Sequence, residues 1–545
     1  MFADIKQAYE HSTASSGIGG MVSASKREAA EIGIDILRKG GNAFDAAVAA
    51  AFALAVCEPA ASGLGGGGFM TAYCKNENKD MFVDFREIAP GFAEPSMWKL
   101  DENGKVIGDE QAIGPKSVCI PGEVAGLCYI SERYGSMPLA QVIQPAIDLA
   151  YDGYVVSDLM EGDLSDRRAD MEKFAEPGNV YLERHWKKGD IIRNPCLAKT
   201  LELIRDNGPD IFYKGEIAER IIKSLNKFGG RFAAGDFSEY RVNEYTPIRG
   251  NYRGYDIMSS PPPSSGGTHV VEMLNILENF DLKSAGFGSK EHLHILSETF
   301  KKCFADRAKY MGDPKFVDLP LGGLTSKEYA AVRAAEIKSD EVSKAEPGDP
   351  FAFECPSTTH MSVADKYGNL VSMTQTISAF FGSAMVPENT GIVLNCQMRC
   401  FSVGEGKSNS VAPYKKPLSS MSPTIVLKDG EPYAVIGSPG ANRIIGGVAQ
   451  VVSNLIDHGM TLLDAVAAPR IYNDTENVLK YEPRFEDAVI EALENEGEVC
   501  RAVKPLDRYM GGINAICLGR DGIMTGAADP RRNGVSICCE STASE

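Results

Sequence analysis

The sequence predicts a layered α+β protein with central antiparallel sheets. Three observations support this fold class: strand-like alternation occurs near both ends of the chain, helical spacing dominates the middle from about 115 to 340, and helices flank the strands on both sides. The chain has 545 residues, of which 43% are hydrophobic. It can therefore bury a large core, in one big domain or in a few smaller ones.

Residues 25–57 are expected to form two helices. Ser25 and Glu28 have the spacing of a capping box at the start of the first helix. The Gly-Gly-Asn stretch at 40–42 ends this helix, and Asn42 is placed to cap the second one.

A glycine-rich stretch, "SGLGGGGFM" at 62–70, leads from the second helix into a strand, and a further strand is expected to end near Arg86. "GLGGGG" formally matches the G-x-G-x-x-G of dinucleotide-binding loops. Such a loop needs a strand before it and a helix after it, which is the reverse of the order here. A dinucleotide-binding oxidoreductase is therefore the weaker alternative, because it rests on this stretch alone.

The middle of the chain is expected to be helical at 123–135, 272–280 and 291–310. His292 and His294 lie two residues apart on the last of these helices, so they point to different sides. The sequence contains no H-E-x-x-H, no P-loop and no G-x-S-x-G. We therefore expect no metal, no cofactor and no α/β-hydrolase chemistry.

The composition argues against several kinds of partner. The formal net charge is −18 without a local cluster of Lys and Arg, whereas binding to nucleic acid needs a basic surface. The N-terminus lacks the features of a signal peptide, and the longest apolar stretch, residues 46–56, is too short to span a bilayer. We expect a cytoplasmic protein with reduced cysteines that binds neither nucleic acid nor a membrane.

Residues 337–357 are the best candidate for a linker, because they are charged, carry Gly and Pro, and lack periodicity. "THMSVAD" at 359–365 follows and is expected to pair with "LVSMTQTI" across a turn at 366–369. A second hairpin is expected around Asp429-Gly430. "SPGANRII" then joins a strand end to a long helix through a glycine turn.

The threonines after the linker have two interpretations. Threonine suits strands, so Thr358 can be an ordinary strand residue. Alternatively, the chain is cleaved between Ser357 and Thr358, which gives Thr358 a free α-amine. A threonine hydroxyl is a weak nucleophile without a base, and an α-amine with an unperturbed pKa of about 7.7 to 8.0 is such a base. Spacing alone does not choose between these interpretations.

The chain resembles the γ-glutamyltransferase (glutathione hydrolase) family of N-terminal-nucleophile hydrolases from about residue 20 to 532. The segments that carry the resemblance are "KGGNAFDAAVAAAFALAVCEP", "SGLGGGGFM", "DFREIAP", "VCIPGEVAGL", "PPPSSGGTHVVEMLNILENFDL", "ADRAKYMGDP", "TTHMSVAD", "PLSSMSPTIV", "GSPGANRII" and "AADPR". The resemblance implies a four-layer αββα sandwich. It also implies a proenzyme that cuts itself into residues 1–357 and 358–545, which remain paired as one unit. The implied reaction is hydrolysis or transfer of the acyl group of small γ-glutamyl amides such as glutathione, with water, an amine or a peptide as acceptor.

The same resemblance assigns catalytic roles. Thr358 corresponds to the nucleophile and Thr376 to the threonine that orients it. Gly440 corresponds to one glycine of the oxyanion hole, and the partner glycine is Ala441 here. A backbone N–H is all that this role needs, so the resemblance keeps Ala441 in the site.

Further residues are expected to bind the substrate. Arg86, Ser419 and Ser420 correspond to the residues that hold its carboxylate, for which a planar guanidinium is well suited. Arg86 could equally be an ion-paired residue at a strand end. Gln397 corresponds to the glutamine of the family's N-x-Q-M stretch.

One segment departs from the family pattern. The family's "NQMDDF" is "CQMRCF" at 396–401, so the aspartate that pairs with the α-ammonium of the γ-glutamyl group falls on Cys400. An asparagine that contacts the same ammonium falls on Ser378. An ammonium buried without its partner costs several kcal/mol of desolvation. The sequence therefore leaves open a second function, an acylase for mono-amides of dicarboxylic acids without the α-amine, of the glutaryl or oxamate type.

Overall fold

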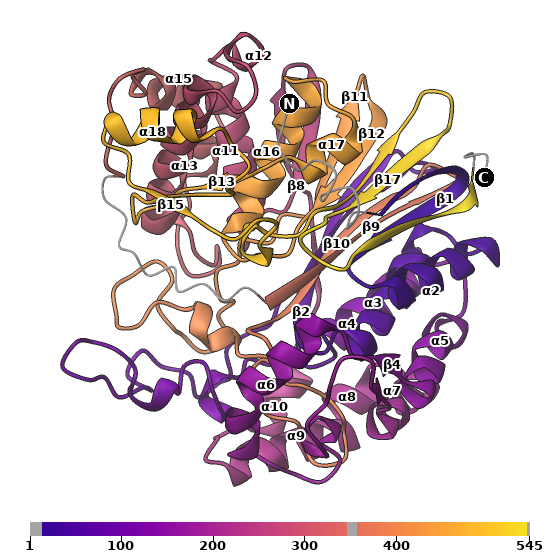
Figure 1. The fold of residues 1–545 in the computed structure, drawn as a ribbon. Coiled ribbons are helices and arrows are strands. Elements are labelled where there is room, and N and C mark those ends of the chain that lie inside the picture. Colours follow the sequence, from indigo (N-terminus) through magenta and orange to yellow (C-terminus); the bar gives the residue numbers. More distant parts are fainter. Residues whose placement is uncertain (1–12, 346–356, 542–545) are drawn as a thin grey trace.

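A computed structural model describes residues 13–345 and 357–541, and its centre is a 13-stranded sheet (Figure 1). All the strand pairs of this sheet are antiparallel. In sheet order the strands are β6 (Asn243–Tyr245), β3 (Lys79–Phe85), β2 (Gly67–Cys74), β10 (Leu370–Ser378), β9 (Ser357–Asp365), β1 (Ala14–Ala24), β17 (Met524–Ala528), β16 (Asn514–Leu518), β12 (Glu431–Gly437), β11 (Thr424–Lys428), β8 (Tyr255–Ser259) and β7 (Ile248–Tyr252), and β18 (Val535–Ser541) pairs with β1. The predicted α+β class with a central antiparallel sheet is confirmed.

The sheet curls, so that strands distant in its order face each other. Ser372 in β10 donates a hydrogen bond of 3.2 Å to the carbonyl of Ile436 in β12, although four strands lie between β10 and β12 in the sheet order. Apolar side chains from both parts of the sheet form a buried cluster together: Met21, Tyr73, Met258, Ala364, Leu370, Ile425, Leu427, Val435, Ile516, Met524 and Cys538.

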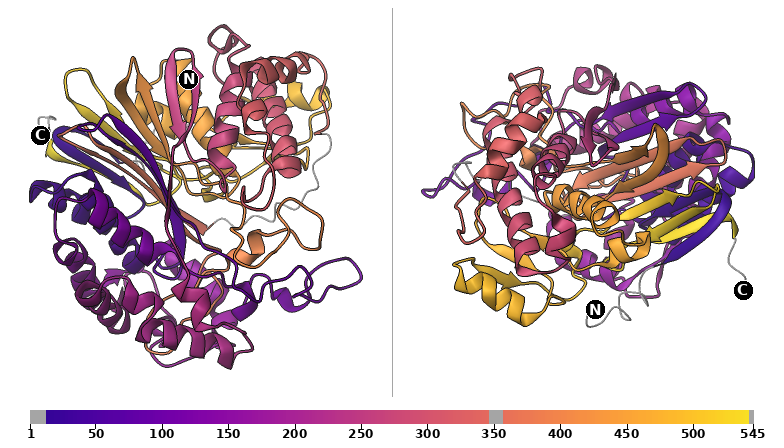
Figure 2. Two further views of the ribbon diagram at one scale, coloured as in Figure 1. Left: turned by 180° about the vertical axis from the view of Figure 1, so that it is seen from behind. Right: turned by 90° about the horizontal axis from the view of Figure 1, so that it is seen from above.

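Two groups of helices cover the outer faces of this curled sheet (Figure 1, Figure 2). One group contains α2 (Arg27–Arg38), α3 (Ala43–Cys57), α4 (Glu123–Tyr134), α5 (Leu139–Asp152), α6 (Asp158–Glu172), α7 (Pro195–Asn207), α8 (Asp210–Tyr213), α9 (Glu216–Lys227) and α10 (Ala234–Ser238). The other contains α11 (Gly266–Leu277), α12 (Leu282–Ala285), α13 (Lys290–Tyr310), α14 (Leu321–Leu324), α15 (Lys327–Ala335), α16 (Arg443–Ile456), α17 (Leu462–Ala467) and α18 (Asp487–Asn495). The short strands β4 (Tyr154–Val155), β5 (Ile191–Ile192), β13 (Ile471–Tyr472), β14 (Leu479–Tyr481) and β15 (Cys500–Ala502) form two small sheets.

The two predicted N-terminal helices are α2 and α3. Asn42 caps α3 as expected, since its side chain accepts hydrogen bonds from the amides of Phe44 and Asp45. The capping box expected at Ser25 is wrong. Helix α2 begins after Lys26, and the Ser25 hydroxyl instead accepts a hydrogen bond of 3.3 Å from the Asn514 side chain. The Ser25 hydroxyl therefore binds a side chain of the distant strand β16 and not the first turn of α2.

Both predicted hairpins are confirmed. β9 pairs with β10 and β11 pairs with β12, where Asp429 and Gly430 form the turn with positive φ angles of 55° and 77°. The first part of the predicted linker lies along α13, where the Lys338 carbonyl and the Ser343 side chain bind His294 and Glu298. Residues 346–356, the rest of that linker, lie outside the described residues.

Candidate active site

Thr358 lies at the start of β9, on the face that points into the curled sheet. Alternate residues of a strand point to opposite faces. Met361 and Val363 pack into the core against α3, so Thr358, His360 and Ser362 share the other face. Thr358 is 5% exposed. Burial lowers the pKa of His360 to about 3, so this ring is neutral and serves as a hydrogen-bonding group.

Thr376 lies directly beside Thr358. The two hydroxyl oxygens are 3.2 Å apart, and the Thr376 oxygen also accepts a hydrogen bond of 2.9 Å from the amide of Ser378. This amide is in reach because the pairing of β9 with β10 becomes irregular between Gln375 and Ser378, where Ser378 has a φ of +79°. The end of β10 therefore fixes the Thr376 hydroxyl against the predicted nucleophile.

Residues 378, 397 and 400 form one cluster next to this pair. The Cys400 thiol donates to the Gln397 amide oxygen over 3.2 Å and lies 3.5 Å from the Ser378 hydroxyl. The carbonyl of Cys400 accepts a hydrogen bond from the Asn409 side chain. The structure thus brings Ser378 and Cys400, which both depart from the family pattern, into contact with each other, and Ser378 also contacts Thr376.

Arg86 follows β3 and is almost completely buried. Its guanidinium contacts the Glu87 carboxylate at 3.3 Å and donates to the carbonyls of Pro417 and Leu418. Burial raises the pKa of Glu87 to about 7, although the neighbouring Arg86 opposes this shift. The ion-paired interpretation of Arg86 is observed, and the same side chain also borders the segment that contains the predicted Ser419 and Ser420.

Ser420 has a partner that the sequence reasoning missed. Its hydroxyl donates to Asn442 over 2.5 Å and accepts a hydrogen bond of 2.9 Å from Arg307, whose guanidinium also reaches Ser265. The Ser419 hydroxyl has a different partner from that of Ser420, since it accepts a hydrogen bond from the amide of Met421.

Arg307 is a buried cation without an acidic partner in the described part of the chain, where no carboxylate lies within 4 Å of it. Burial lowers its pKa to about 10, and Tyr472, Cys400 and Asp474 act in the opposite direction. Arg307 belongs to the "ADRAKYMGDP" segment, but nothing in the sequence of that segment predicts its contacts with Ser420 and Ser265.

The predicted oxyanion residues form the turn between β12 and α16. Gly440 and Ala441 have positive φ angles of 134° and 53°. A side chain at Gly440 would also meet Gly511, because a Cβ there would lie 3.0 Å from its Cα. Within residues 13–345 and 357–541, no acceptor is found for the amide of Gly440 or of Ala441. Gly437, at the end of β12, packs against the His360 ring and so brings this turn toward the start of β9.

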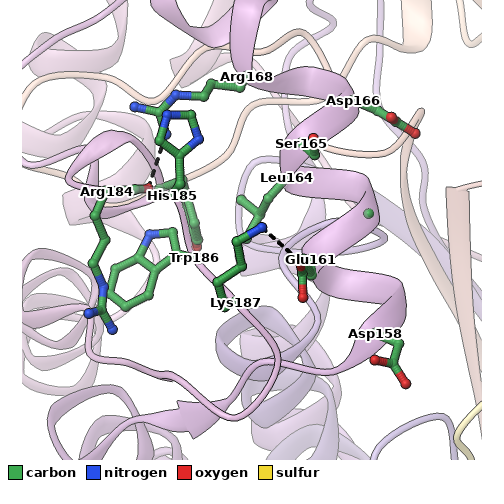
Figure 3. A pocket seen from close by; sticks show the side chains of 12 residues that line it. Asp158, Glu161, Leu164, Ser165, Asp166, Arg168, Arg184, His185, Trp186 and Lys187 are labelled. Atoms are coloured by element: carbon green, nitrogen blue, oxygen red, sulfur yellow. Dashed lines mark hydrogen bonds and ion pairs between the residues drawn. The ribbon is translucent and has the colours of Figure 1, made fainter.

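A separate polar hollow of about 490 Å³ lies between α6 and the segment around Trp186 (Figure 3). Lys187 reaches across it to Glu161 over 3.0 Å, and the Arg184 guanidinium stacks on the Trp186 ring. None of the predicted site residues lines it. In the described residues there is also no group of three metal-ligating side chains, and no helix there has the length and apolar character to cross a membrane.

Comparison with solved structures defines the class of fold. The structure of cephalosporin acylase from Bacillus halodurans aligns with a TM-score of 0.87 at 29% identity and covers 97% of both chains. Helicobacter pylori gamma-glutamyltranspeptidase aligns with a TM-score of 0.57 at 39% identity and covers 61% of this chain and 95% of its own. The mixed α/β fold with its curled antiparallel sheet is therefore that of the acylases and transpeptidases of N-terminal-nucleophile type.

The family follows from the sequence comparisons. The gamma-glutamyltranspeptidase family model matches residues 29–539, and the chain belongs to this family. The glutathione hydrolase proenzyme of Escherichia coli K12 is 43% identical over 529 residues, which cover 94% of this chain and 90% of the relative. The acylase ACY 1 proenzyme of Pseudomonas sp. SE83 is 38% identical over 532 residues, with 96% and 94% covered.

Proposed function

We propose that the protein is a proenzyme that cleaves itself before Thr358 and then hydrolyses or transfers the acyl group of γ-glutamyl amides. The observation that carries this proposal is the buried Thr358 hydroxyl at the start of β9, 3.2 Å from the Thr376 hydroxyl, in a chain whose relatives include glutathione hydrolase proenzymes. Relatives named glutathione hydrolase proenzyme support the substrate class.

The two fragments, 1–357 and 358–545, would remain one unit after cleavage. In the sheet, β10 lies between β2 and β9, and β9 lies between β10 and β1. Strands of the two fragments therefore alternate, and separating them would break several ladders of hydrogen bonds. We propose that this unit is the four-layer αββα sandwich, because helices cover both outer faces of a sheet that folds onto itself.

Self-cleavage would begin with attack of the Thr358 hydroxyl on the carbonyl carbon of Ser357. The C–N bond breaks, the acyl group moves to the hydroxyl oxygen, and the former amide nitrogen becomes the α-amine of Thr358. Water then splits the ester, which leaves a carboxylate on Ser357 and restores the Thr358 hydroxyl. Nucleophile and base are now held in one residue.

In turnover, the α-amine accepts the hydroxyl proton while the Thr358 oxygen attacks the donor amide carbonyl. The oxyanion that forms would be held by the free amides of Gly440 and Ala441, next to the N-terminus of α16. Thr376 can donate a hydrogen bond to the attacking oxygen. Transfer of the proton to the leaving amine breaks the C–N bond, and water or an acceptor amine then releases the acyl group from Thr358.

A second candidate function is an acylase for mono-amides of dicarboxylic acids. The observation that favours it is the cluster of Ser378 and Cys400, which places neutral groups where an α-ammonium would need a carboxylate. The buried cation Arg307 lies close to the same cluster and makes it less favourable for an ammonium group. The acylases among the relatives are compatible with this candidate.

The self-cleavage is tested on a denaturing gel with N-terminal sequencing. We expect two bands, of which the smaller begins Thr-Thr-His-Met, while Thr358→Ala remains one inactive band. Thr359→Val is the matched control, because Thr359 lies on the opposite face and its hydroxyl has no described partner. An uncleaved wild-type chain with full amidase activity would refute the proposal.

A further inference from the structure

Arg532 is a buried cation that contacts the main chain of Thr358. Its Nη1 donates a hydrogen bond of 3.3 Å to the Thr358 carbonyl, and the residue is 8% exposed. Its Nε and Nη2 find no acceptor in the described part of the chain. The "AADPR" segment ends one residue earlier, so no motif of the sequence points to Arg532.

The surroundings of Arg532 hold it in place without neutralising it. Gly512 makes room for the side chain, since a Cβ at this position would lie 2.6 Å from the Arg532 Cδ. The charged groups that act on Arg532 are Glu58, Asp163, Asp529 and Arg508. No carboxylate among the described residues lies within 4 Å of its guanidinium.

Two of the three neighbouring acids are already bound to other cations. Asp163 pairs with Arg508 at 3.0 Å, and Asp529 pairs with Arg470 at 2.7 Å and with Arg531 at 3.0 Å. Glu58, just after α3, lines the same small cavity as Arg532, together with Lys26 and Arg508. The positive charge of Arg532 is therefore only partly balanced at the point where it touches Thr358.

We infer that Arg532 is a positioning residue, which fixes the main chain of Thr358 and keeps its α-amine uncharged near neutral pH. This inference rests on the proposed self-cleavage, because the α-amine exists only in the cleaved protein. The carbonyl oxygen and the nitrogen of one residue are about 3 Å apart, so the guanidinium lies within about 6 to 7 Å of the amine. A cation at this distance disfavours a second positive charge on the amine, and only the uncharged amine can accept the proton of the hydroxyl.

The experiment compares the cleaved wild type with Arg532→Met, Arg532→Gln and Arg532→Lys. Met and Gln both remove the charge, and Gln keeps a hydrogen-bond donor, whereas Lys keeps the charge. Arg508→Met is the matched control, because it removes a cation from the same cavity without touching the Thr358 carbonyl. Two quantities are measured against pH: kcat/KM, and the rate at which an acylating reagent labels the N-terminal amine of the small fragment, followed by mass spectrometry.

In Arg532→Met and Arg532→Gln the α-amine loses a neighbouring cation, so its pKa should rise. We expect the pH at which the labelling rate is half-maximal, and the acidic limb of the pH profile of kcat/KM, to move up by about one pH unit. Arg532→Lys should stay near the wild type, and Arg508→Met should move less than the two neutral variants. Unchanged midpoints in a cleaved neutral variant would overturn the inference. A wild type that yields no fragment beginning at Thr358 would instead refute the proposed function, so the two failures are distinguishable.

Discussion

Replacing Cys400 by Asp should change which acyl donor the protein prefers. The thiol lies 3.2 Å from the Gln397 amide oxygen and 3.5 Å from the Ser378 hydroxyl, so a carboxylate at this position would enter the same cluster. It would supply a partner for an α-ammonium and also a counter-charge for the nearby Arg307. We expect Cys400→Asp to favour γ-glutamyl donors over glutaryl donors, which differ only by the α-amine.

The size of the effect follows from one hydrogen bond between charged groups. Such a bond contributes about 1.5 to 3 kcal/mol, and every 1.4 kcal/mol corresponds to about a factor of ten. The ratio of kcat/KM for the γ-glutamyl donor to that for the glutaryl donor should therefore rise about 10- to 100-fold. Use of this ratio cancels any effect of the substitution on the amount of folded enzyme.

The assay measures release of the same chromogenic amine from both donors, for the wild type, Cys400→Asp and Cys400→Asn. Asn has nearly the shape of Asp but no charge, so it should leave the ratio within about threefold of the wild type. Equal shifts for Asp and Asn would refute the electrostatic reasoning. A wild type that already strongly prefers the γ-glutamyl donor would show that the pocket binds the ammonium without a carboxylate at position 400.

Two further predictions concern buried side chains near the site. Thr376→Val should lower kcat by about 10- to 100-fold, because it removes the hydroxyl 3.2 Å from the nucleophile, while Thr376→Ser should retain most of the activity; equal losses in steady-state assays would contradict this. Burial raises the pKa of the Glu123 carboxyl well above its usual value, and the charge of Glu87 raises it further. Because the folded state favours the protonated Glu123 carboxyl, the contribution of this group to the free energy of unfolding is complete below the unfolded pKa of about 4.3. This contribution is lost as pH rises through the folded pKa. Denaturant unfolding should therefore show Glu123→Gln gaining stability relative to the wild type between pH 5 and 8, by at most about 1.4 kcal/mol per pH unit.

Much of the fold could be predicted because its signals are local. The turn at Asp429-Gly430 requires positive φ angles at both positions, and the alternation after Thr358 fixes which residues face the core. The cap at Asn42 is equally local, since its partners are the next two amides of the helix. Ser25 shows the limit, because a strand residue almost five hundred positions away binds its hydroxyl.

The site was predictable only where the resemblance supplied the residues. Thr358 and Thr376 are brought together by the register of β9 and β10, which the hairpin pattern anticipates. Arg307 and Arg532 could not be found in this way. Each one acquires its place from elements far apart in the chain, Arg307 beside Ser420 and Arg532 beside Thr358, and an arginine in a sequence gives no sign of whether a carboxylate will lie next to it.

The charged groups around Ser378, Gln397 and Cys400 affect which acyl donor can bind there. Arg86 shares its charge with Glu87, whose pKa of about 7 leaves this carboxyl partly protonated near neutral pH. Arg307 has no carboxylate within ion-pair distance in the described residues, and Cys400 stands where the family pattern has an acid. Asp474 partly offsets the charge of Arg307. A donor that brings an ammonium to this place adds a positive charge near Arg307 without a carboxylate at position 400, whereas a donor without the ammonium adds none. The two candidate donors therefore differ in the charge that they bring next to position 400, and the comparison of Cys400→Asp with Cys400→Asn measures how much that difference contributes.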